Sequence, residues 1–218
     1  MATVLKFDEI NKPFSYRDFF GKMHISVAQM NRRIEIAEAI EDAMILVFAY
    51  WLIHADLGMS VADMKKYTRD QLKAVYDRYT KSDGYVENRL DYLSNEIIDV
   101  TDKHTSVGAD DDEDDSDEPT SYWTSKDRAR IIAENEANAF ENYNDYKAAK
   151  AKGYTKKRWL TELDDKVRLT HTLVEGETVD IDGFFLVGDS KMRFPMDTMY
   201  DPDPNEIVNC RCACVYEP

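Results

Sequence analysis

The sequence predicts an α+β protein: an N-terminal helical bundle, an acidic linker, then a long helix leading into a small, mainly antiparallel C-terminal sheet domain. Three observations point to this fold class. Apolar residues recur at steps of three and four through residues 15–102, the period of an amphipathic helix. Residues 110–118 contain eight acids in nine positions. From Lys156 onward, short runs of alternating polarity are separated by Gly and Pro, as in strands joined by turns.

The size and charge of the chain limit what it can be. Its 218 residues, 43% of them hydrophobic, suffice for one large domain or two small ones. The net charge is −15, and without the acids of residues 110–118 there remain 35 acids against 28 bases. This acidic balance disfavours duplex DNA as the main partner, because neutralising phosphates requires clustered Lys and Arg.

The longest apolar pattern predicts one helix over residues 27–57, ended by Gly58 as a left-handed C-cap. Within it, residues 43–53 are all apolar, so this part needs neighbouring helices on every side or a partner subunit. A stretch of eleven residues is shorter than the roughly 20 that span a bilayer. We therefore expect a buried helix and no membrane partner.

Local signals place the other helices of the bundle. Ser60 and Thr68 are candidate N-caps, and Thr-Arg-Asp-Gln from Thr68 fits a capping box. Asp83-Gly84 indicates a break, after which apolar spacing predicts a further helix that ends near Asp102.

Residues 106–121 are predicted to link a helical region, residues 1–105, to a C-terminal domain, residues 122–218. The clustered carboxylates repel one another and bury nothing, so we expect a disordered, solvated spacer. Alternatively, the acids mimic nucleic acid or bind a basic segment of the same chain.

The C-terminal domain is expected to open with a helix over residues 126–152, capped by Ser125 and ended by Gly153. Strands are predicted at residues 157–161 and 207–215.

A basic segment lies where this helix meets the first strand. Six cations occur there without an intervening acid: Lys147, Lys150, Lys152, Lys156, Lys157 and Arg158. Such a run is usually a solvated face. It is nevertheless the candidate interaction surface of the chain, for an acidic portal surface, packaged DNA or the acidic linker.

Three cysteines, Cys210, Cys212 and Cys214, alternate on the last predicted strand. Side chains two residues apart on a strand stand about 7 Å apart, too far for a disulfide, so reduced thiols of a cytosolic protein are expected. Together with His171 they are suitable zinc ligands, but the same spacing is nearly twice the separation of two sulfurs on one zinc ion. The pattern therefore favours small buried residues over a zinc site at His171, Cys210 and Cys212, and predicts no cofactor.

Asp164, Asp165 and His171 offer a second interpretation, an acid–base site. The sequence lacks an accompanying nucleophile, phosphate-binding Gly-rich loop or second ligand cluster. The favoured interpretation is structural, with Asp165 paired to Arg168 and His171 hydrogen-bonded beneath the sheet. We predict no catalytic residue and no enzymatic activity.

The order of residues from Lys157 to Cys212 resembles the C-terminal domain of the phage Mu protein F-like family, the minor head or head morphogenesis proteins of tailed phages. The pattern is K-x-W, D-x-x-V-R-x-x-H, G-x-x-V-x-I-x-x-x-F, V-G, P-x-D and a terminal N-C-R-C. Residues 125–138 also look like the family's lead-in helix. The motif residues taken as structural, or as a site, are Trp159, Asp165, Arg168, His171, Asn209, Cys210, Arg211 and Cys212.

The resemblance implies a minor capsid or head morphogenesis protein of a tailed phage or prophage, made in the host cytoplasm and built into the virion head interior. Its partners would be portal, capsid or scaffold proteins, close to packaged DNA, during assembly and DNA packaging or ejection. In this interpretation the apolar helix around residues 43–53 mediates docking. Two alternatives remain: a metal-dependent hydrolase or nuclease using Asp165, His171 and the C-terminal cysteines, and an interaction protein whose acidic run competes with nucleic acid.

Overall fold

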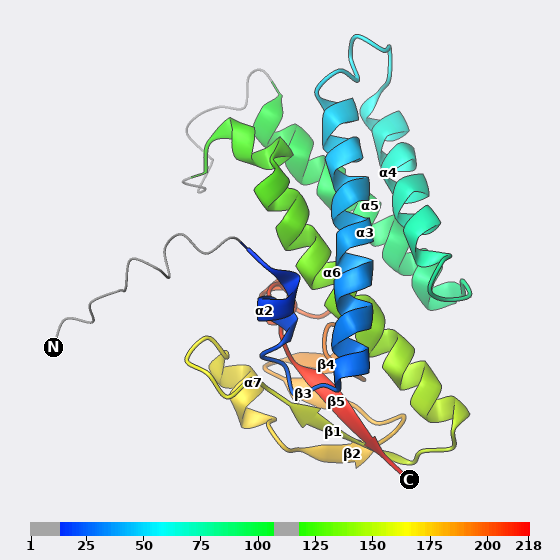
Figure 1. The fold of residues 1–218 in the computed structure, drawn as a ribbon, viewed down its shortest axis with the longest axis vertical. Helices are drawn as coiled ribbons and strands as arrows, with labels where there is room; N and C mark the ends of the chain where they lie inside the picture. Colours follow the sequence, from blue (N-terminus) through cyan, green and yellow to red (C-terminus); the bar gives the residue numbers. More distant parts are fainter. Residues whose placement is uncertain (1–13, 107–117) are drawn as a thin grey trace, which may run out of the picture.

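The computed structural model describes residues 14–106 and 118–218. Long helices form an elongated bundle that stands on two small sheets near the C-terminus (Figure 1). This arrangement confirms the predicted α+β class. The first thirteen residues and residues 107–117, which contain seven of the eight acids of the acidic run, lie outside the described residues.

Five helices of the described residues form the bundle, and all but the first begin at a side-chain cap. These helices are α2 (Tyr16–Phe20), α3 (Val27–Trp51), α4 (Val61–Tyr76), α5 (Gly84–Thr105) and α6 (Lys126–Ala151), with a 3₁₀ turn, η1 (Thr120–Thr124), before α6. Ser60 caps α4 in a reciprocal capping box with Asp63, and Ser125 caps α6, as predicted. The predicted capping box at Thr68 is wrong: Thr68 lies inside α4, where its hydroxyl donates to the Met64 carbonyl over 2.8 Å.

Helix α3 is shorter than predicted. It ends at Trp51, and residues 52–58 form turns that close at Gly58, whose φ of 67° is left-handed as expected. One face of the apolar stretch is buried, but the other is not: Leu46 is 50% exposed and Ile53 46%. Among the described residues, no helix combines the length and hydropathy required to cross a membrane.

The C-terminal part forms two antiparallel sheets. Strands β2 (Thr178–Asp180), β1 (Lys156–Leu160) and β5 (Ala213–Glu217) form the first sheet in that order, and β3 (Phe185–Val187) pairs with β4 (Ser190–Met192) across a tight turn at Gly188. A short helix, α7 (Leu169–Leu173), and a 3₁₀ turn, η2 (Pro204–Glu206), complete this part. The strand predicted over residues 207–215 is therefore wrong for residues 207–212, which form turns and extended coil.

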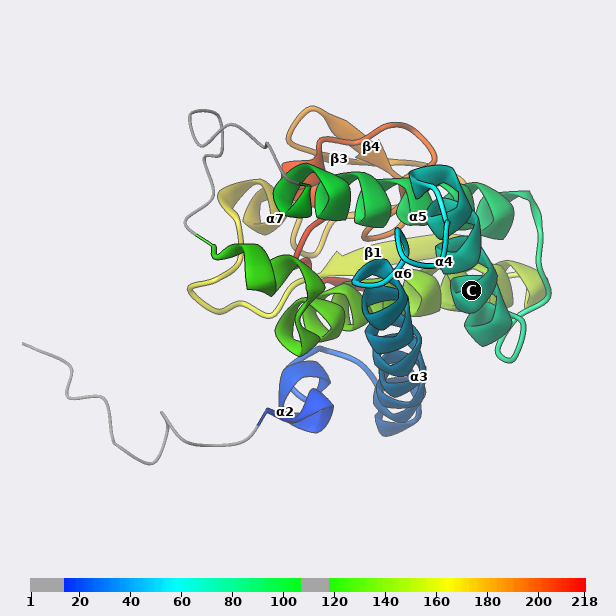
Figure 2. The same cartoon turned by 90° about the horizontal axis from the view of Figure 1, so that it is seen from above.

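The predicted boundary between residues 1–105 and 122–218 does not coincide with a break in packing. Helix α6 crosses α3 and is its main packing partner (Figures 1 and 2). The buried hydrophobic side chains of bundle and sheets form one continuous cluster. At the far end of the bundle, His104 of α5 stacks on Trp123 of η1 with ring centroids 3.8 Å apart.

Candidate functional site

Three side chains from two distant segments meet next to Trp159 of β1. His171 lies on α7, and Cys210 and Cys212 lie just before β5. The His171 Nδ1 atom is 3.3 Å from Cys212 Sγ and 3.7 Å from Cys210 Sγ, and the three ligand atoms all lie within 4.8 Å of one another. All three side chains are at least 96% buried.

The two thiols converge because their segment is not a strand. Asn209 is left-handed, with φ of 58°, and the Cys210 amide donates to the Ile207 carbonyl over 3.1 Å. Asn is the residue besides Gly that most readily adopts this conformation. The turn removes the pleat that would hold alternate side chains about 7 Å apart, so the spacing argument against a shared ligand does not apply here.

Buried amides fix the backbone on either side of Arg211. The Asn138 side chain donates to the Cys210 carbonyl over 2.9 Å, and Asn142 donates to the Cys212 carbonyl over 3.2 Å. Both asparagines lie on α6, four residues apart, and therefore share one helix face. Their oxygens accept hydrogen bonds from Arg33 of α3, which is fully buried. The cysteine segment is thus anchored to both long helices.

A carboxylate orients the imidazole of His171. Its Nε2 atom is 3.0 Å from Glu206 Oε2, and that carboxylate also accepts from Thr170 Oγ1 over 2.7 Å. A carboxylate only accepts, so in neutral His171 the proton sits on Nε2 and the Nδ1 lone pair faces the two sulfurs. The edge of the ring meets Trp159, which is fully buried, with centroids 5.8 Å apart.

Proton equilibria in the cluster are shifted. The hydrogen bond with Cys212 and the nearby imidazole lower the pKa of Cys210 well below its usual value, despite burial. The hydrogen bond with Cys210 and burial raise the pKa of Cys212. Burial disfavours the imidazolium of His171, but hydrogen bonding and charge attraction from Cys210 outweigh it, so the pKa of His171 is raised. Cys210 is therefore the thiol that ionises first.

A small cavity borders the cluster. Its volume is about 10 Å³, which is room for about one water molecule. Glu162 lines it, with only 4% of its side chain exposed, and the Oε1 atom of Glu162 has no hydrogen-bond partner among the described residues. A thiol, a histidine and a carboxylate also occur together in nucleophilic enzymes, but a substrate would not fit in this cavity.

The other motif residues hold the loop around the cluster. Arg211 binds Asp164 through two hydrogen bonds of 2.7 and 2.8 Å, and Arg168 donates to the Val208 carbonyl. The structure contradicts the expected pair of Asp165 with Arg168. The acid that forms an ion pair is Asp164, and its partner is Arg211. Asp165 is exposed and does not line the cavity. Asn209 holds the turn onto α6 through hydrogen bonds with Asn135.

The basic segment is not a surface of unpaired positive charge. Four of its cations form ion pairs: Lys147 with Asp83, Lys150 with Asp182, Lys156 with Asp180, and Arg158 with Glu217. Lys157 is fully buried and donates to the Ile181 and Gly183 carbonyls over 2.7 and 2.8 Å. Burial lowers the pKa of Lys157 to about 8. Acids distant in sequence therefore neutralise most of this segment.

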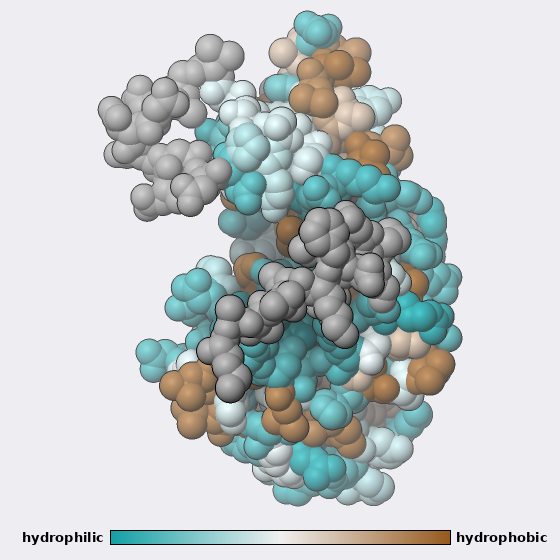
Figure 3. All heavy atoms as spheres, turned by 60° about the vertical axis from the view of Figure 1, so that its left-hand side comes forward, coloured by the Kyte–Doolittle hydropathy of each residue, from teal (hydrophilic) through white to brown (hydrophobic). Residues whose placement is uncertain are grey.

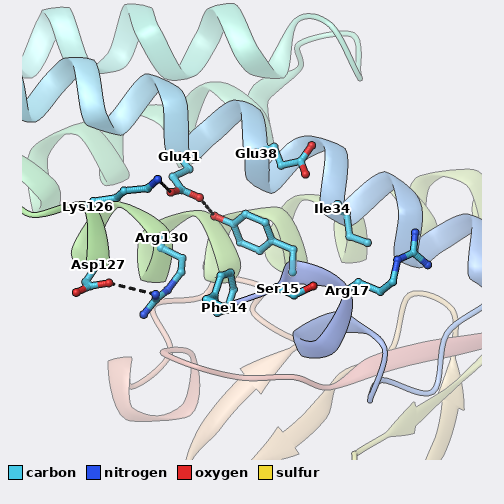
Figure 4. Close-up of a pocket in the computed structure, with 10 residues that line it drawn as sticks. Phe14, Ser15, Arg17, Ile34, Glu38, Glu41, Lys126, Asp127 and Arg130 are labelled. Atoms are coloured by element: carbon cyan, nitrogen blue, oxygen red, sulfur yellow. Dashed lines mark hydrogen bonds and ion pairs between the residues drawn. The ribbon is translucent and has the colours of Figure 1, made fainter. Parts of the chain in front are cut away.

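A larger cavity, of about 670 Å³, lies away from the motif residues. It opens between α2, α3 and the start of α6 (Figure 4). Tyr16 donates to Glu41 there over 2.6 Å, and Arg130 pairs with Asp127 over 3.1 Å. Next to it, burial raises the pKa of Glu134 to about 7, against the opposing charge of Arg130.

Sequence reasoning missed four residues that shape the cluster: Glu206, Glu162, Asn138 and Asn142. The two asparagines carried a signal, because polar residues four apart on the apolar face of a helix require buried partners. Glu206 and Glu162 gave no signal in the sequence, since only the tertiary fold brings them to His171.

No model of a known family, no curated protein and no solved structure matches this chain.

Proposed function

We propose that this chain is a minor head morphogenesis protein of a tailed phage or prophage, which associates with the portal or the inner capsid during head assembly and DNA packaging or ejection. The supporting observation is that the separate pieces of the Mu F-like pattern contact one another in a single folded unit. This is the expectation for a pattern that belongs to one domain.

The contacts join one motif piece to another. Lys157 of K-x-W donates to the Ile181 carbonyl of G-x-x-V-x-I-x-x-x-F. The Gly176 amide donates to the Trp159 carbonyl over 2.9 Å, and Trp159 contacts Phe185 edge to face, with centroids 5.2 Å apart.

Further contacts involve the pieces D-x-x-V-R-x-x-H, N-C-R-C and P-x-D. Asp164 of D-x-x-V-R-x-x-H pairs with Arg211 of N-C-R-C, and His171 contacts both cysteines. The aspartate of P-x-D, Asp197, is fully buried against Arg193 over 2.7 Å.

An exposed apolar surface suits docking to a portal or capsid protein. We call it the α3 tip. It comprises exposed hydrophobic side chains at the end of α3 and in the following turns: Ile45, Leu46, Tyr50, Leu52, Ile53 and Leu57. Hydrophobic side chains gather at this end of the molecule in Figure 3. Contiguous apolar surface of this kind marks a protein interface.

The ion pairs of the basic segment limit how strongly it can bind DNA. With most of its cations neutralised by carboxylates, this segment offers few charges for phosphate contacts. The proposal therefore rests on protein partners, with packaged DNA as a neighbour.

The test is peptide mass spectrometry of purified mature particles and DNA-free proheads from the induced host, with whole lysate as the reference for abundance. We expect peptides of this chain at low stoichiometry in both particle types. Presence in proheads alone would define a transient assembly factor. Absence from both, with the chain abundant in lysate, would refute the proposal.

A further inference from the structure

We propose that His171 Nδ1, Cys210 Sγ and Cys212 Sγ bind a structural zinc ion, with a water molecule in the adjoining cavity as fourth ligand. The proposal is independent of the head-protein assignment, because it rests on the ligand geometry alone. It reverses the expectation from sequence, which assumed a regular strand through the cysteines.

The distances fit one tetrahedral ion. Zinc bonds of about 2.3 Å to sulfur and 2.0–2.1 Å to nitrogen place ligand nitrogen and sulfur roughly 3.6 Å apart. The observed separations from His171 Nδ1 are 3.3 and 3.7 Å. With the His171 proton on Nε2, the Nδ1 lone pair faces both sulfurs, an arrangement in which one metal ion engages all three atoms.

The orientation of the imidazole supplies a second, independent argument. Metal-bound histidines almost always donate their other ring nitrogen to a carboxylate or carbonyl, which fixes the tautomer and points the lone pair at the metal. Glu206 occupies that position, 3.0 Å from His171 Nε2. Glu206 in turn is held by Thr170, so the ligand is positioned before any ion arrives.

Ligand chemistry and charge select zinc. Thiolates and imidazole favour zinc over the hard cations Mg²⁺ and Ca²⁺. Two thiolates neutralise a divalent ion, so the buried complex with neutral His171 carries no net charge. The third cysteine, Cys214, is also buried but does not belong to the cluster.

The position of the ion indicates a structural role. The cavity beside the cluster admits about one water molecule and no substrate. The ion would join α7 to the segment before β5, which Asn138 and Asn142 already fasten to α6. A bond between segments about forty residues apart stabilises the folded state, since the unfolded chain has no preformed site.

The test uses the full chain, unfolded with a chelator, refolded with or without zinc chloride, and desalted. We expect about one zinc ion per chain by elemental analysis, and a higher melting temperature for the zinc-loaded protein. Cobalt(II) in place of zinc should give a sulfur-to-cobalt charge-transfer band. Folded wild-type protein that holds no zinc and shows no such band would overturn the proposal, and rapid alkylation of Cys210 in that protein would assign the pair to thiol chemistry instead.

Variants separate the ligands from their surroundings. Cys210→Ser, Cys212→Ser and His171→Ala should lose zinc, whereas Cys214→Ser, which removes a buried thiol outside the cluster, should retain it. Glu206→Gln should bind zinc about 10- to 100-fold more weakly in competition with a chelating dye. Full affinity in Cys210→Ser, or loss in Cys214→Ser alone, would reject this ligand set. If the ligand variants do not fold, the wild-type cobalt spectrum decides.

Discussion

The guanidinium of Arg33 donates to the side-chain oxygen of Asn138 over 2.9 Å, and neither side chain is more than 1% exposed. The amide nitrogen of Asn138 bonds the Cys210 carbonyl in the same way. A single side chain therefore connects a helix near the N-terminus to the cysteine segment near the C-terminus. The bundle and the C-terminal sheets should unfold together.

Replacing Asn138 with Leu should destabilise the whole chain. The change removes an acceptor from a buried cation and a donor from a buried carbonyl, each worth about 1–3 kcal/mol when left unsatisfied. We expect a loss of about 2–5 kcal/mol in a single urea transition, monitored in parallel by far-ultraviolet circular dichroism and tryptophan fluorescence. Asn95→Ala, at an exposed site on α5, should change stability by no more than about 0.5 kcal/mol. Two separate transitions would contradict the coupling.

Substitution of the adjacent residues Lys156 and Lys157 should lower stability by very different amounts. Lys157→Met leaves the Ile181 and Gly183 carbonyls without their donor, and we expect a loss of about 2–4 kcal/mol. Lys156→Met removes an exposed ion pair with Asp180, worth at most about 1 kcal/mol. Chemical denaturation of both variants measures the contrast, and equal effects would show that Lys157 is not buried as described.

Glu134 should make stability fall as pH rises. Its pKa in the folded state is raised to about 7, chiefly by burial, whereas an unfolded Glu titrates near its usual value of about 4.3. Between these values the folded state binds the additional proton, so stability is greatest below about pH 4 and declines through pH 7.

Glu134→Gln removes this dependence. The variant should gain about 1–3 kcal/mol relative to wild type between pH 5 and pH 8, measured by urea unfolding at each pH. Glu96→Gln, at an exposed carboxyl on α5, is the matched control for the loss of one carboxyl. A flat difference for Glu134→Gln would show that Glu134 is ionised in the folded state throughout this range.

The α3 tip should be required for incorporation into particles. The double change Leu46→Asp with Ile53→Asp places charge on exposed apolar positions, so it should leave folding intact while lowering the chain's abundance in proheads about tenfold or more, equivalent to about 1.4 kcal/mol. Leu173→Asp, at a 76% exposed position on α7, is the control. Unchanged incorporation of the double variant, measured by quantitative peptide mass spectrometry, would place the docking surface elsewhere.

The sequence predicted those features that depend on local signals. Ser60, Ser125 and Gly84 begin or precede helices as expected, because capping and backbone preferences act within one turn. The end of α3 was not predicted, because no Gly or Pro breaks it. At this end the His54 imidazole bonds the Trp51 carbonyl three residues before it, and the Trp51 indole donates to Thr105 of α5 over 2.9 Å.

The candidate site was only half predictable. Its ligand types were evident in His171, Cys210 and Cys212, but their convergence depends on the left-handed backbone of Asn209, a conformation that Asn permits without requiring. The partners Glu206 and Asn138 are 35 and 72 residues from the groups they contact, and no periodicity encodes such distances.

The stack of His104 on Trp123 has a practical consequence. It joins the segments before and after residues 107–117, and α3 and α6, which also lie on either side of this interval, pack against each other. Cleavage of the chain within this interval should therefore yield two fragments that copurify as one complex. Expressed as separate polypeptides, the same fragments should reconstitute each other, which makes this interval the natural place to insert a fluorescent or affinity label.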